Sequence, residues 1–455
     1  MKLMRIVMIM AVLFAALNAD TELTIEKNVS GYASIEEGQI VQGTYPTQSN
    51  GLPAADHVWV QRLYTGFIAS TLFNPLNIKG NIGLEMRVSN EFPRKYSGDF
   101  GVTRRLYFYP YLTEADFTYC IGDISKPLFG VTVGYFPIKY NQNSRDLGEY
   151  LFRSGTYPQT LVTDFDFSAT RLVGFNVSYS PFKGLNLNLI LNSNIEWIAV
   201  GDLNLSGLVT YNPTDIFEIG AGVCQSSIIS ADRKATDGEK SLAQEANQYL
   251  KPNGDTAMYT FRGTKLMGMA SFDPKKPLEE LLGSLDLLGK EDLKLYAEAA
   301  VLGVKNYPAA LYPTGSNGIK YYTDIAKRIP VMFGFNLPAF KFLDVLSIEG
   351  EWFGSLMPND MYNGVFYNEP TPINADTRLS VYVRDSISGH KQYKDDNWKW
   401  SVYAKRTFVG HFQIVGGIAS DHLRWYAQDW TKAEWEEAFR NPRQFYYRIK
   451  LAYMF

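Results

Sequence analysis

The residues best suited to chemistry in this sequence are charged and aromatic side chains gathered in residues 141–171. The segment reads NQNSRDLGEYLFRSGTYPQTLVTDFDFSATR, and acids and bases are interspersed along it. Opposed charges across a narrow aqueous passage create a transverse field that orders water and selects solutes by charge and size. Local salt bridges on a solvated surface loop explain the same composition equally well. The candidate filter residues are Arg145, Asp146, Glu149, Tyr150, Arg153, Asp164, Asp166 and Arg171.

Catalytic motifs are scarce in the sequence. Asp421 and His422 form an acid–histidine pair of the kind that activates water in proteases. Adjacent residues on a strand point to opposite faces, however, and no second acidic pair accompanies them. His411 lies in a tight VGH turn and His57 lies just before a predicted strand, so neither has an evident serine partner. Because HExxH, CxxC and Gly-rich phosphate motifs are also absent, we predict no enzymatic activity and no cofactor.

Composition excludes further classes of protein. Two cysteines and four histidines are too few for a Cys-rich or His-rich metal site, so we predict no metal. Cys120 and Cys224 are interpreted as small apolar residues at strand ends, and a disulfide between them is left open. Lys and Arg number 44 against 47 Asp and Glu, a formal net charge of −3. Nucleic-acid binding through a basic surface is therefore excluded.

The first 19 residues, MKLMRIVMIMAVLFAALNA, predict an export signal. Lys2 and Arg5 form a positive start, an apolar run follows from Ile6 to Leu17, and Ala19 suits the position before cleavage. Beyond the first 20 residues no stretch of 18 apolar residues occurs, which excludes a bundle of transmembrane helices. We predict that 1–19 are removed and that 20–455 form one domain, without room for a plug before the first strand.

Period-two alternation runs through the rest of the chain. Residues 185–196, LNLNLILNSNIE, place leucines on one face of a strand and asparagines on the other. The same alternation recurs at 84–89, 172–180, 345–353 and 447–453. It predicts sheets with an apolar wall and a polar wall. A soluble β-sandwich has the same period, so alternation alone does not decide the fold.

Loop lengths separate these folds. Short turns, most of them containing proline, alternate with mostly long loops, as in a bacterial outer-membrane barrel. Lipid offers no hydrogen-bond partner, so every backbone N–H and C=O has to pair within the sheet, and the sheet has to close. Sixteen strands then enclose an aqueous lumen. The longest connection on the short-turn side, 273–292, predicts a short amphipathic helix. The predicted strands are 21–33, 58–70, 77–89, 105–119, 128–140, 172–180, 185–196, 203–212, 217–229, 256–272, 293–307, 328–337, 343–355, 398–409, 412–425 and 445–455.

The predicted fold is therefore all-β: a transmembrane antiparallel up-and-down β-barrel of about 16 strands. Charged residues on the polar faces of its strands are candidates for lining the lumen, and their signs are mixed. These candidates are Glu85, Arg87, Lys294, Glu298, Glu349, Glu351, Lys399, Lys405, Arg448 and Lys450.

The chain ends FYYRIKLAYMF, with apolar residues at every second position before a terminal phenylalanine. This ending resembles the last strand of bacterial outer-membrane barrel proteins, whose terminal aromatic is read by the barrel-assembly machinery. The resemblance implies the outer membrane of a diderm, Gram-negative bacterium, with its lipid and the barrel-assembly machinery as partners. The residues of the assembly signal are Tyr447, Ile449, Leu451, Tyr453 and Phe455.

Residues 141–171 form the third long loop, and in sixteen-stranded porins the third long loop folds inward and narrows the channel. Residues 130–154, GVTVGYFPIKYNQNSRDLGEYLFRS, resemble the phosphate-selective porin O/P family, which implies an inward loop with acidic and basic residues. Phosphate selectivity needs a ladder of Arg and Lys, which the mixed lumen candidates do not supply, so it is not carried over. Porins of this size are often trimers, which leaves a homotrimer open.

We therefore expect an outer-membrane porin for passive diffusion of small hydrophilic solutes or ions, constricted by an inward-folded loop 141–171. One alternative is a non-transporting surface protein whose long extracellular loops, above all 356–397, bind a ligand or matrix. The other is a secreted soluble β-rich protein that binds carbohydrate through exposed Tyr and Trp.

Overall fold

The structure is a computed structural model, and it describes eighteen stretches of the chain. The predicted signal peptide, 1–19, lies outside them. The described residues are 24–43, 58–74, 76–91, 107–123, 126–154, 157–158, 161–164, 167–193, 201–229, 248–250, 256–258, 263–304, 325–354, 397–422, 424–426, 433–437, 439 and 441–455.

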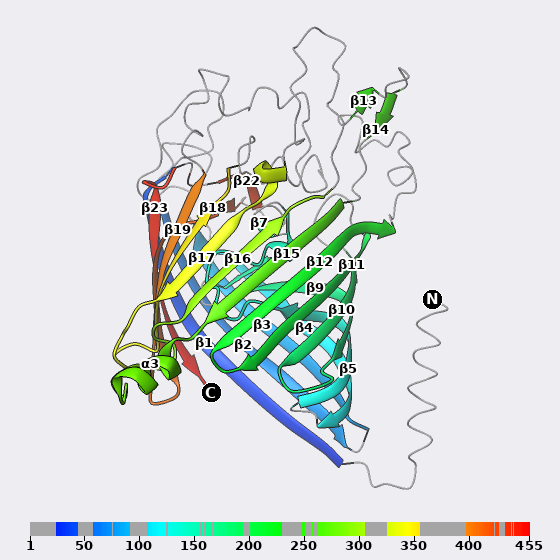
Figure 1. The fold of residues 1–455 in the computed structure, drawn as a ribbon, viewed down its shortest axis with the longest axis horizontal. Helices are drawn as coiled ribbons and strands as arrows, with labels where there is room; N and C mark the ends of the chain where they lie inside the picture. Colours follow the sequence, from blue (N-terminus) through cyan, green and yellow to red (C-terminus); the bar gives the residue numbers. More distant parts are fainter. Residues whose placement is uncertain are drawn as a thin grey trace.

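Sixteen antiparallel strands of the described chain form one closed barrel (Figure 1). The strands are β1 Thr24–Gln42, β2 Val58–Asn74, β3 Ile78–Glu91, β4 Tyr107–Asp123, β5 Lys126–Ile138, β9 Phe167–Tyr179, β10 Leu185–Ser193, β11 Leu203–Thr214, β12 Phe217–Ile229, β15 Gly263–Phe272, β16 Leu295–Val301, β17 Val331–Asn336, β18 Val345–Trp352, β19 Trp398–Phe408, β20 Phe412–Ser420 and β23 Phe445–Met454. Each pairs with the next in this order, and β1 pairs with β23 to close the ring. Because every predicted strand overlaps one of them, the predicted all-β up-and-down barrel is confirmed.

Shorter elements lie within the connections of the barrel. The helix predicted in 273–292 is confirmed as α3. No helix in the described ranges is both long and apolar enough to cross a bilayer. The elements outside the barrel wall are η1 Tyr150–Phe152, β6 Arg153–Ser154, β7 Tyr157–Pro158, β8 Leu161–Asp164, β13 Gln248–Leu250, β14 Thr256–Met258, α3 Lys275–Leu282, η2 Ile325–Arg328, β21 Arg424–Tyr426 and β22 Ala433–Glu437.

The alternation seen in the sequence places apolar side chains outside the barrel and polar ones inside. On β23, Ile449 and Leu451 are exposed, whereas Arg448 and Lys450 are buried. On β3, the buried Glu85 alternates with exposed apolar neighbours in the same way. Exposed aliphatic and buried charged side chains reverse the usual order of a soluble protein, and they fit a sheet with hydrocarbon outside and water inside. The closed ring also contradicts the sandwich alternative.

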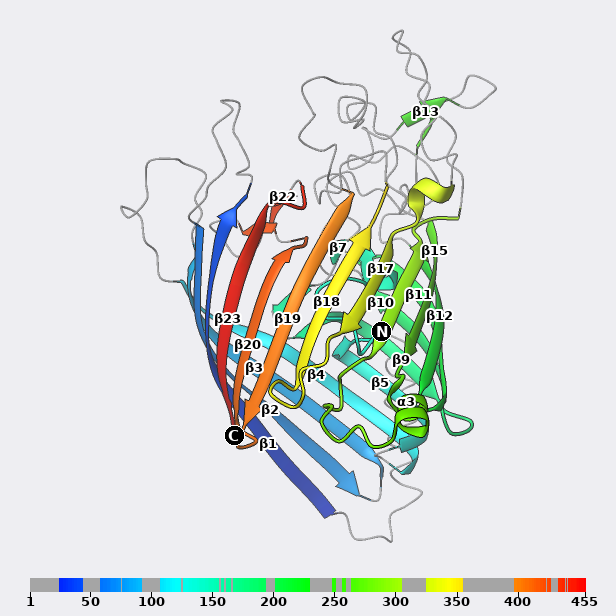
Figure 2. The same cartoon turned by 60° about the vertical axis from the view of Figure 1, so that its left-hand side comes forward.

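The barrel wall is uneven in height. Strands β1, β2 and β4 have 19, 17 and 17 residues, whereas β16, β17 and β18 have only 7, 6 and 8. Both views show the lower ends of β1–β3 reaching well past those of β16 and β17 (Figures 1 and 2). The C-terminus and α3 lie at this lower end, which we call the short-turn rim.

The terminal phenylalanine closes the seam of the barrel. The backbone N–H of Gly31 on β1 donates to the carbonyl of Phe455 at 2.7 Å, and that of Phe455 donates back at 2.8 Å. The Phe455 ring fills the space that a side chain on Gly31 would occupy, and its centroid lies 6.1 Å from that of Tyr453. The last residue therefore pairs with and packs on the first strand.

The substitution Gly31→Leu tests this seam, because a leucine there displaces the Phe455 ring. We expect the free energy of unfolding in lipid vesicles to fall by about 1–2 kcal/mol, the scale of one lost aromatic contact. Urea titration followed by gel mobility without heating measures it. Gly268→Leu on β15 is the matched control, since a Cβ at Gly268 meets nothing within 4 Å. Equal stability of the two variants contradicts the seam.

Candidate functional site

Residues 139–154, here called the inner segment, leave the end of β5 and pack inside the barrel. Leu147, Tyr150 and Leu151 are almost fully buried. They share one apolar cluster with Met267 of β15 and Met332 of β17, which occupy inward positions of the wall. The inner segment is therefore held against the interior of the barrel by apolar packing as well as by hydrogen bonds.

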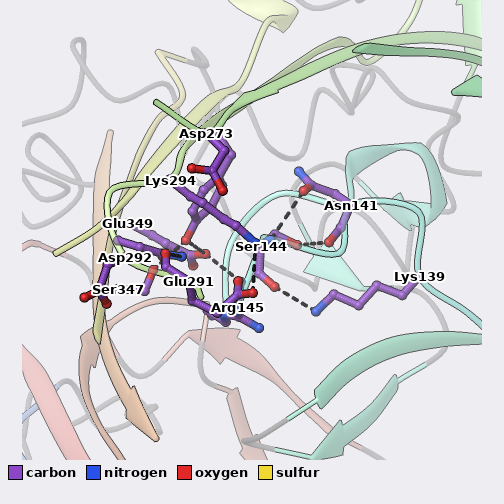
Figure 3. A network of polar contacts seen from close by, with 12 residues as sticks. Lys139, Asn141, Ser144, Arg145, Asp273, Glu291, Asp292, Lys294, Ser347 and Glu349 are labelled. Atoms are coloured by element: carbon purple, nitrogen blue, oxygen red, sulfur yellow. Dashed lines mark hydrogen bonds and ion pairs between the residues drawn. The ribbon is translucent and has the colours of Figure 1, made fainter. Parts of the chain in front are cut away.

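The carboxylate of Glu349 on β18 binds the backbone of the inner segment (Figure 3). It accepts N–H groups from Arg145 at 2.5 Å, Asp146 at 2.9 Å and Leu147 at 3.0 Å. The Tyr296 hydroxyl on β16 donates to it as well, at 2.9 Å. One buried wall carboxylate thus satisfies three successive backbone donors that have no strand partner.

A second wall carboxylate, Glu298 on β16, holds the next turn of the inner segment. It accepts the backbone N–H of Glu149 at 3.0 Å and that of Tyr150 at 2.8 Å. The Tyr140 hydroxyl donates to it at 2.6 Å and the Asn141 amide at 3.1 Å. Glu298 and Glu349 together therefore accept five backbone N–H groups from one short stretch of chain.

A left-handed turn brings the inner segment this close to the wall. Gly148 has a φ of 81° and Glu149 a φ of 61°. A Cβ on Gly148 would lie 2.6 Å from the Met332 methyl carbon and 3.1 Å from a Glu298 oxygen. The Glu149 carboxylate turns back and accepts the Asn141 N–H at 2.6 Å. Glycine is thus needed at 148 both for its backbone angle and for the close approach.

The carboxylate of Glu351 forms a third anchor, next to Glu349 on the inner face of β18. The Tyr150 hydroxyl donates to one of its oxygens at 2.7 Å, and His422 Nε2 lies 2.6 Å from the other. Asp421 accepts the Tyr446 hydroxyl at 2.7 Å. Asp421 and His422 were predicted to lie on a strand that runs to 425, and this was wrong, because β20 ends at Ser420. Both are buried in the bend that follows β20, where strand alternation no longer applies.

Charged side chains of the inner segment contact the wall as well. The Arg145 guanidinium lies 5.5 Å from the Tyr403 ring centre and 3.9 Å from a Glu291 oxygen. The Asp146 carboxylate accepts the Ser401 hydroxyl of β19. As whole residues, Lys139, Arg145 and Asp146 are half-buried, so they are the charged residues of the inner segment that remain partly accessible.

Five of the eight predicted filter residues lie together in the inner segment: Arg145, Asp146, Glu149, Tyr150 and Arg153. Glu149, Tyr150 and Arg153 are buried among its hydrogen bonds. Asp164 ends β8, and Asp166 lies outside the described residues. Arg171 belongs to the barrel strand β9, because this strand begins at Phe167 rather than at the predicted 172. Its position alternates with that of the inward-facing Leu172.

The facing wall, formed by β23, β1, β2 and β3, carries ion pairs on its inner side. Arg87 contacts Glu85 at 2.6 Å, and Arg448 contacts Glu36 at 2.6 Å. The Lys450 ammonium lies 5.3 Å from the ring centre of Tyr64 on β2. This wall therefore presents positive groups beside paired acids.

The remaining lumen candidates hold loops or turns in place. Lys399 donates to the Phe439 carbonyl at 2.7 Å, and Lys294 pairs with Glu291 at 2.8 Å near the short-turn rim. Lys405 occupies an inward position of β19, half-buried.

Sequence reasoning missed several residues of the site, notably Glu36, Tyr140, Asn141, Tyr296 and Lys265. Glu36 was missed because β1 continues to Gln42, nine residues past its predicted end. Lys265 donates to the carbonyls of Leu151 and Arg153. Its inward position was readable from the alternation in GTKLMGMASF, whereas its partners were not.

Burial sets the charge state of two carboxyls in the inner segment. Burial, together with the nearby carboxylates of Asp421 and Glu349, raises the pKa of Asp146 to about 7. Burial and the carboxylate of Glu298 raise the pKa of Glu149 to about 8. Both groups therefore titrate around neutral pH.

Metal chemistry finds no support among the described residues, where no group of three or more His, Cys, Asp or Glu could hold an ion. Cys120 and Cys224, both within the described chain, are buried and form no disulfide. They lie on β4 and β12.

Comparison with known proteins finds likeness only among solved structures. No protein-family model and no curated protein sequence matches the chain. A triple mutant of the Rhodopseudomonas blastica porin is 10% identical, covers 94% of this chain and 100% of its own, and has a TM-score of 0.44. The Salmonella typhi OmpF complex with daunomycin is 12% identical, covers 94% and 97%, and has a TM-score of 0.47.

The substitution Gly148→Val tests the fit of the inner segment against the wall. A side chain at a left-handed position costs about 1–2 kcal/mol, and displacing Met332 adds about 1–3 kcal/mol. We expect a loss of about 2–5 kcal/mol in the free energy of unfolding, measured by urea titration. Gly283→Val is the matched control, since Gly283 has a φ of 87° and nothing within 4 Å of its Cβ position. An equal loss in both variants contradicts close packing at Gly148.

The raised carboxyl pKa values predict a dependence of stability on pH. Each group binds its proton more tightly in the folded state than at its unfolded value near 4, so stability falls as pH rises from about 4 to 8. Asp146→Asn removes one such group and should flatten the slope of unfolding free energy against pH below about 7. Asp215→Asn, at an exposed turn, is the control. Because Lys276 beside it lowers the pKa of Asp215, this substitution should leave the slope unchanged above about pH 5. An unaltered slope in Asp146→Asn contradicts the burial of this carboxyl.

Proposed function

We propose that the chain forms a channel in the outer membrane of a diderm bacterium and lets small hydrophilic solutes or ions diffuse passively. An apolar exterior and a polar interior on a closed sixteen-stranded barrel support a water-filled lumen in lipid. The observation that carries the proposal is the inner segment, anchored inside the barrel by Glu298 and Glu349.

The inner segment acts as the constriction of this channel. Solutes pass between it and the wall formed by β23, β1, β2 and β3. Arg145 and Asp146 face the passage from one side, and the Arg87–Glu85 pair and Lys450 line the other. Charges held in place on opposite sides of a narrow aqueous gap create a transverse field, which favours small polar solutes over apolar ones.

Export and assembly follow from the two ends of the chain. Residues 1–19 direct the chain across the inner membrane and are cleaved. The residues of the last strand guide insertion by the barrel-assembly machinery, and Phe455 then pairs with Gly31 in the finished barrel. The homotrimer implied by the porin resemblance stays a prediction, to be checked by the mass of the detergent-solubilised complex.

Single-channel recording in planar bilayers tests both the channel and its constriction. We expect stepwise conductance, and deletion of 147–160 should raise the step and admit larger polyethylene glycols, because it removes the part of the segment that Glu298 anchors. A deletion within 356–397 is the control and should leave the step unchanged. The absence of steps overturns the channel and favours the surface-display alternative. An unchanged step after deletion of 147–160 overturns the constriction alone.

A further inference from the structure

The most exposed large apolar side chains of the described residues gather on three successive turns of the short-turn rim. Leu281, Leu282 and Leu287 are 78%, 68% and 76% exposed in the turn between β15 and β16. Phe342 is 81% exposed between β17 and β18, and Val409 is 89% exposed between β19 and β20. We call these five residues the rim patch. Apolar groups exposed together in this way mark a surface that binds something.

Helix α3 carries the centre of the rim patch and is amphipathic. Leu278, Leu281 and Leu282 follow the spacing i, i+3, i+4 and lie on one face. Lys276 and Glu280 lie on the opposite face. No residue of the helix is buried, so its apolar face is not covered by packing against the described part of the chain.

The strands beside α3 are the shortest of the barrel. A transmembrane strand needs about 9–11 residues to cross the hydrocarbon region. Strands β16, β17 and β18 have 7, 6 and 8 residues, whereas β1 on the tall side has 19. Further backbone hydrogen bonds, such as those from the Leu302 N–H to the Arg328 carbonyl and from the Phe353 N–H to the Asn397 carbonyl, lengthen their pairing, so this wall only just reaches the span of a bilayer. Both views place α3 beyond the ends of β16 and β17, on the side where the wall is short (Figures 1 and 2). The turns thus occupy a level that strands occupy on the tall side.

The rim patch continues the apolar exterior of the wall above it. Leu295, Phe333 and Ile348 are exposed on the outer faces of β16, β17 and β18. Contacts between turns hold the patch in place. The Phe340 N–H donates to Asp292 at 3.1 Å, the Lys275 ammonium donates to the Asp292 carbonyl at 2.7 Å, and the Arg406 guanidinium donates to the Lys341 carbonyl at 2.5 Å.

We propose that the rim patch is a lipid-binding surface, with α3 lying in the boundary between headgroups and acyl chains of the leaflet at the short-turn rim. Leu281, Leu282 and Leu287 enter the acyl region, and the face with Lys276 and Glu280 points to water, as in other interfacial helices. Lipid fits better than a protein partner because the patch is continuous with the outward apolar wall. The inference requires a barrel in a bilayer, and it does not require the lumen to conduct.

Site-directed spin labelling tests this proposal in phospholipid vesicles. Single substitutions Leu281→Cys and Glu280→Cys place a nitroxide on the two faces of α3. Both native cysteines are buried, and the unsubstituted protein measures any background labelling. Phe117→Cys on the outer face of β4 is the lipid reference, and Lys183→Cys in the exposed turn between β9 and β10 is the water reference. All four positions are solvent-accessible, so no buried contact is lost.

Frequent collisions of the nitroxide with oxygen indicate that the label lies in lipid, and frequent collisions with a water-soluble nickel chelate indicate that it lies in water. We expect the label at 281 to match the one at 117, with oxygen collisions dominating, and the label at 280 to match the one at 183. Nickel collisions at 281 as frequent as at 183 overturn the proposal, because the patch then faces water. Shielding of 281 from both reagents also overturns it, because a protein then covers the patch. Neither outcome affects the conductance test of the channel.

Discussion

A sheet that faces hydrocarbon has to pair every backbone N–H and C=O within itself, and this requirement governs the structure. It explains why β1 pairs with both β2 and β23 and why the last residue is part of the seam rather than a loose end. A closed ring has no lateral edge to protect. Side-chain chemistry is then free to differ completely between the two faces of each strand.

The same requirement applies inside the barrel, where the inner segment has no strand beside it. Its backbone donors at residues 145–147 and 149–150 are satisfied by wall carboxylates instead of carbonyls. Moving the charged carboxylates of Glu298 and Glu349 out of water costs free energy. Each carboxylate accepts several hydrogen bonds from the inner segment, and these offset the lost hydration. The two walls therefore use their acids differently: near the inner segment they bind backbone, and on the facing wall Glu36 and Glu85 pair with arginines.

The barrel could be predicted from sequence because its information is local and repeated. Alternation such as LNLNLILNS gives both a strand and its two faces, and loop lengths give the closure. The site depends on contacts that sequence spacing does not reveal. Arg145 binds Glu349, 204 positions further along the chain, so the inward position of the glutamate was predictable and its partner was not. Arg171 and Asp421 were misplaced because strand ends decide where alternation begins and stops.

The uneven wall links these features. The anchoring glutamates lie on β16 and β18, two of the shortest strands, and the inner segment packs on the inside of this same side. Short strands give this wall few inward positions, and the inner segment covers several of them. On the outside this wall only just reaches the span of a bilayer, and in the proposed arrangement the turns with α3 continue its apolar surface into the headgroup boundary. One local shortening of the sheet thus coincides with the support for the inner segment on the inside and with an amphipathic helix on the outside, whereas the tall wall of β1–β4 needs neither.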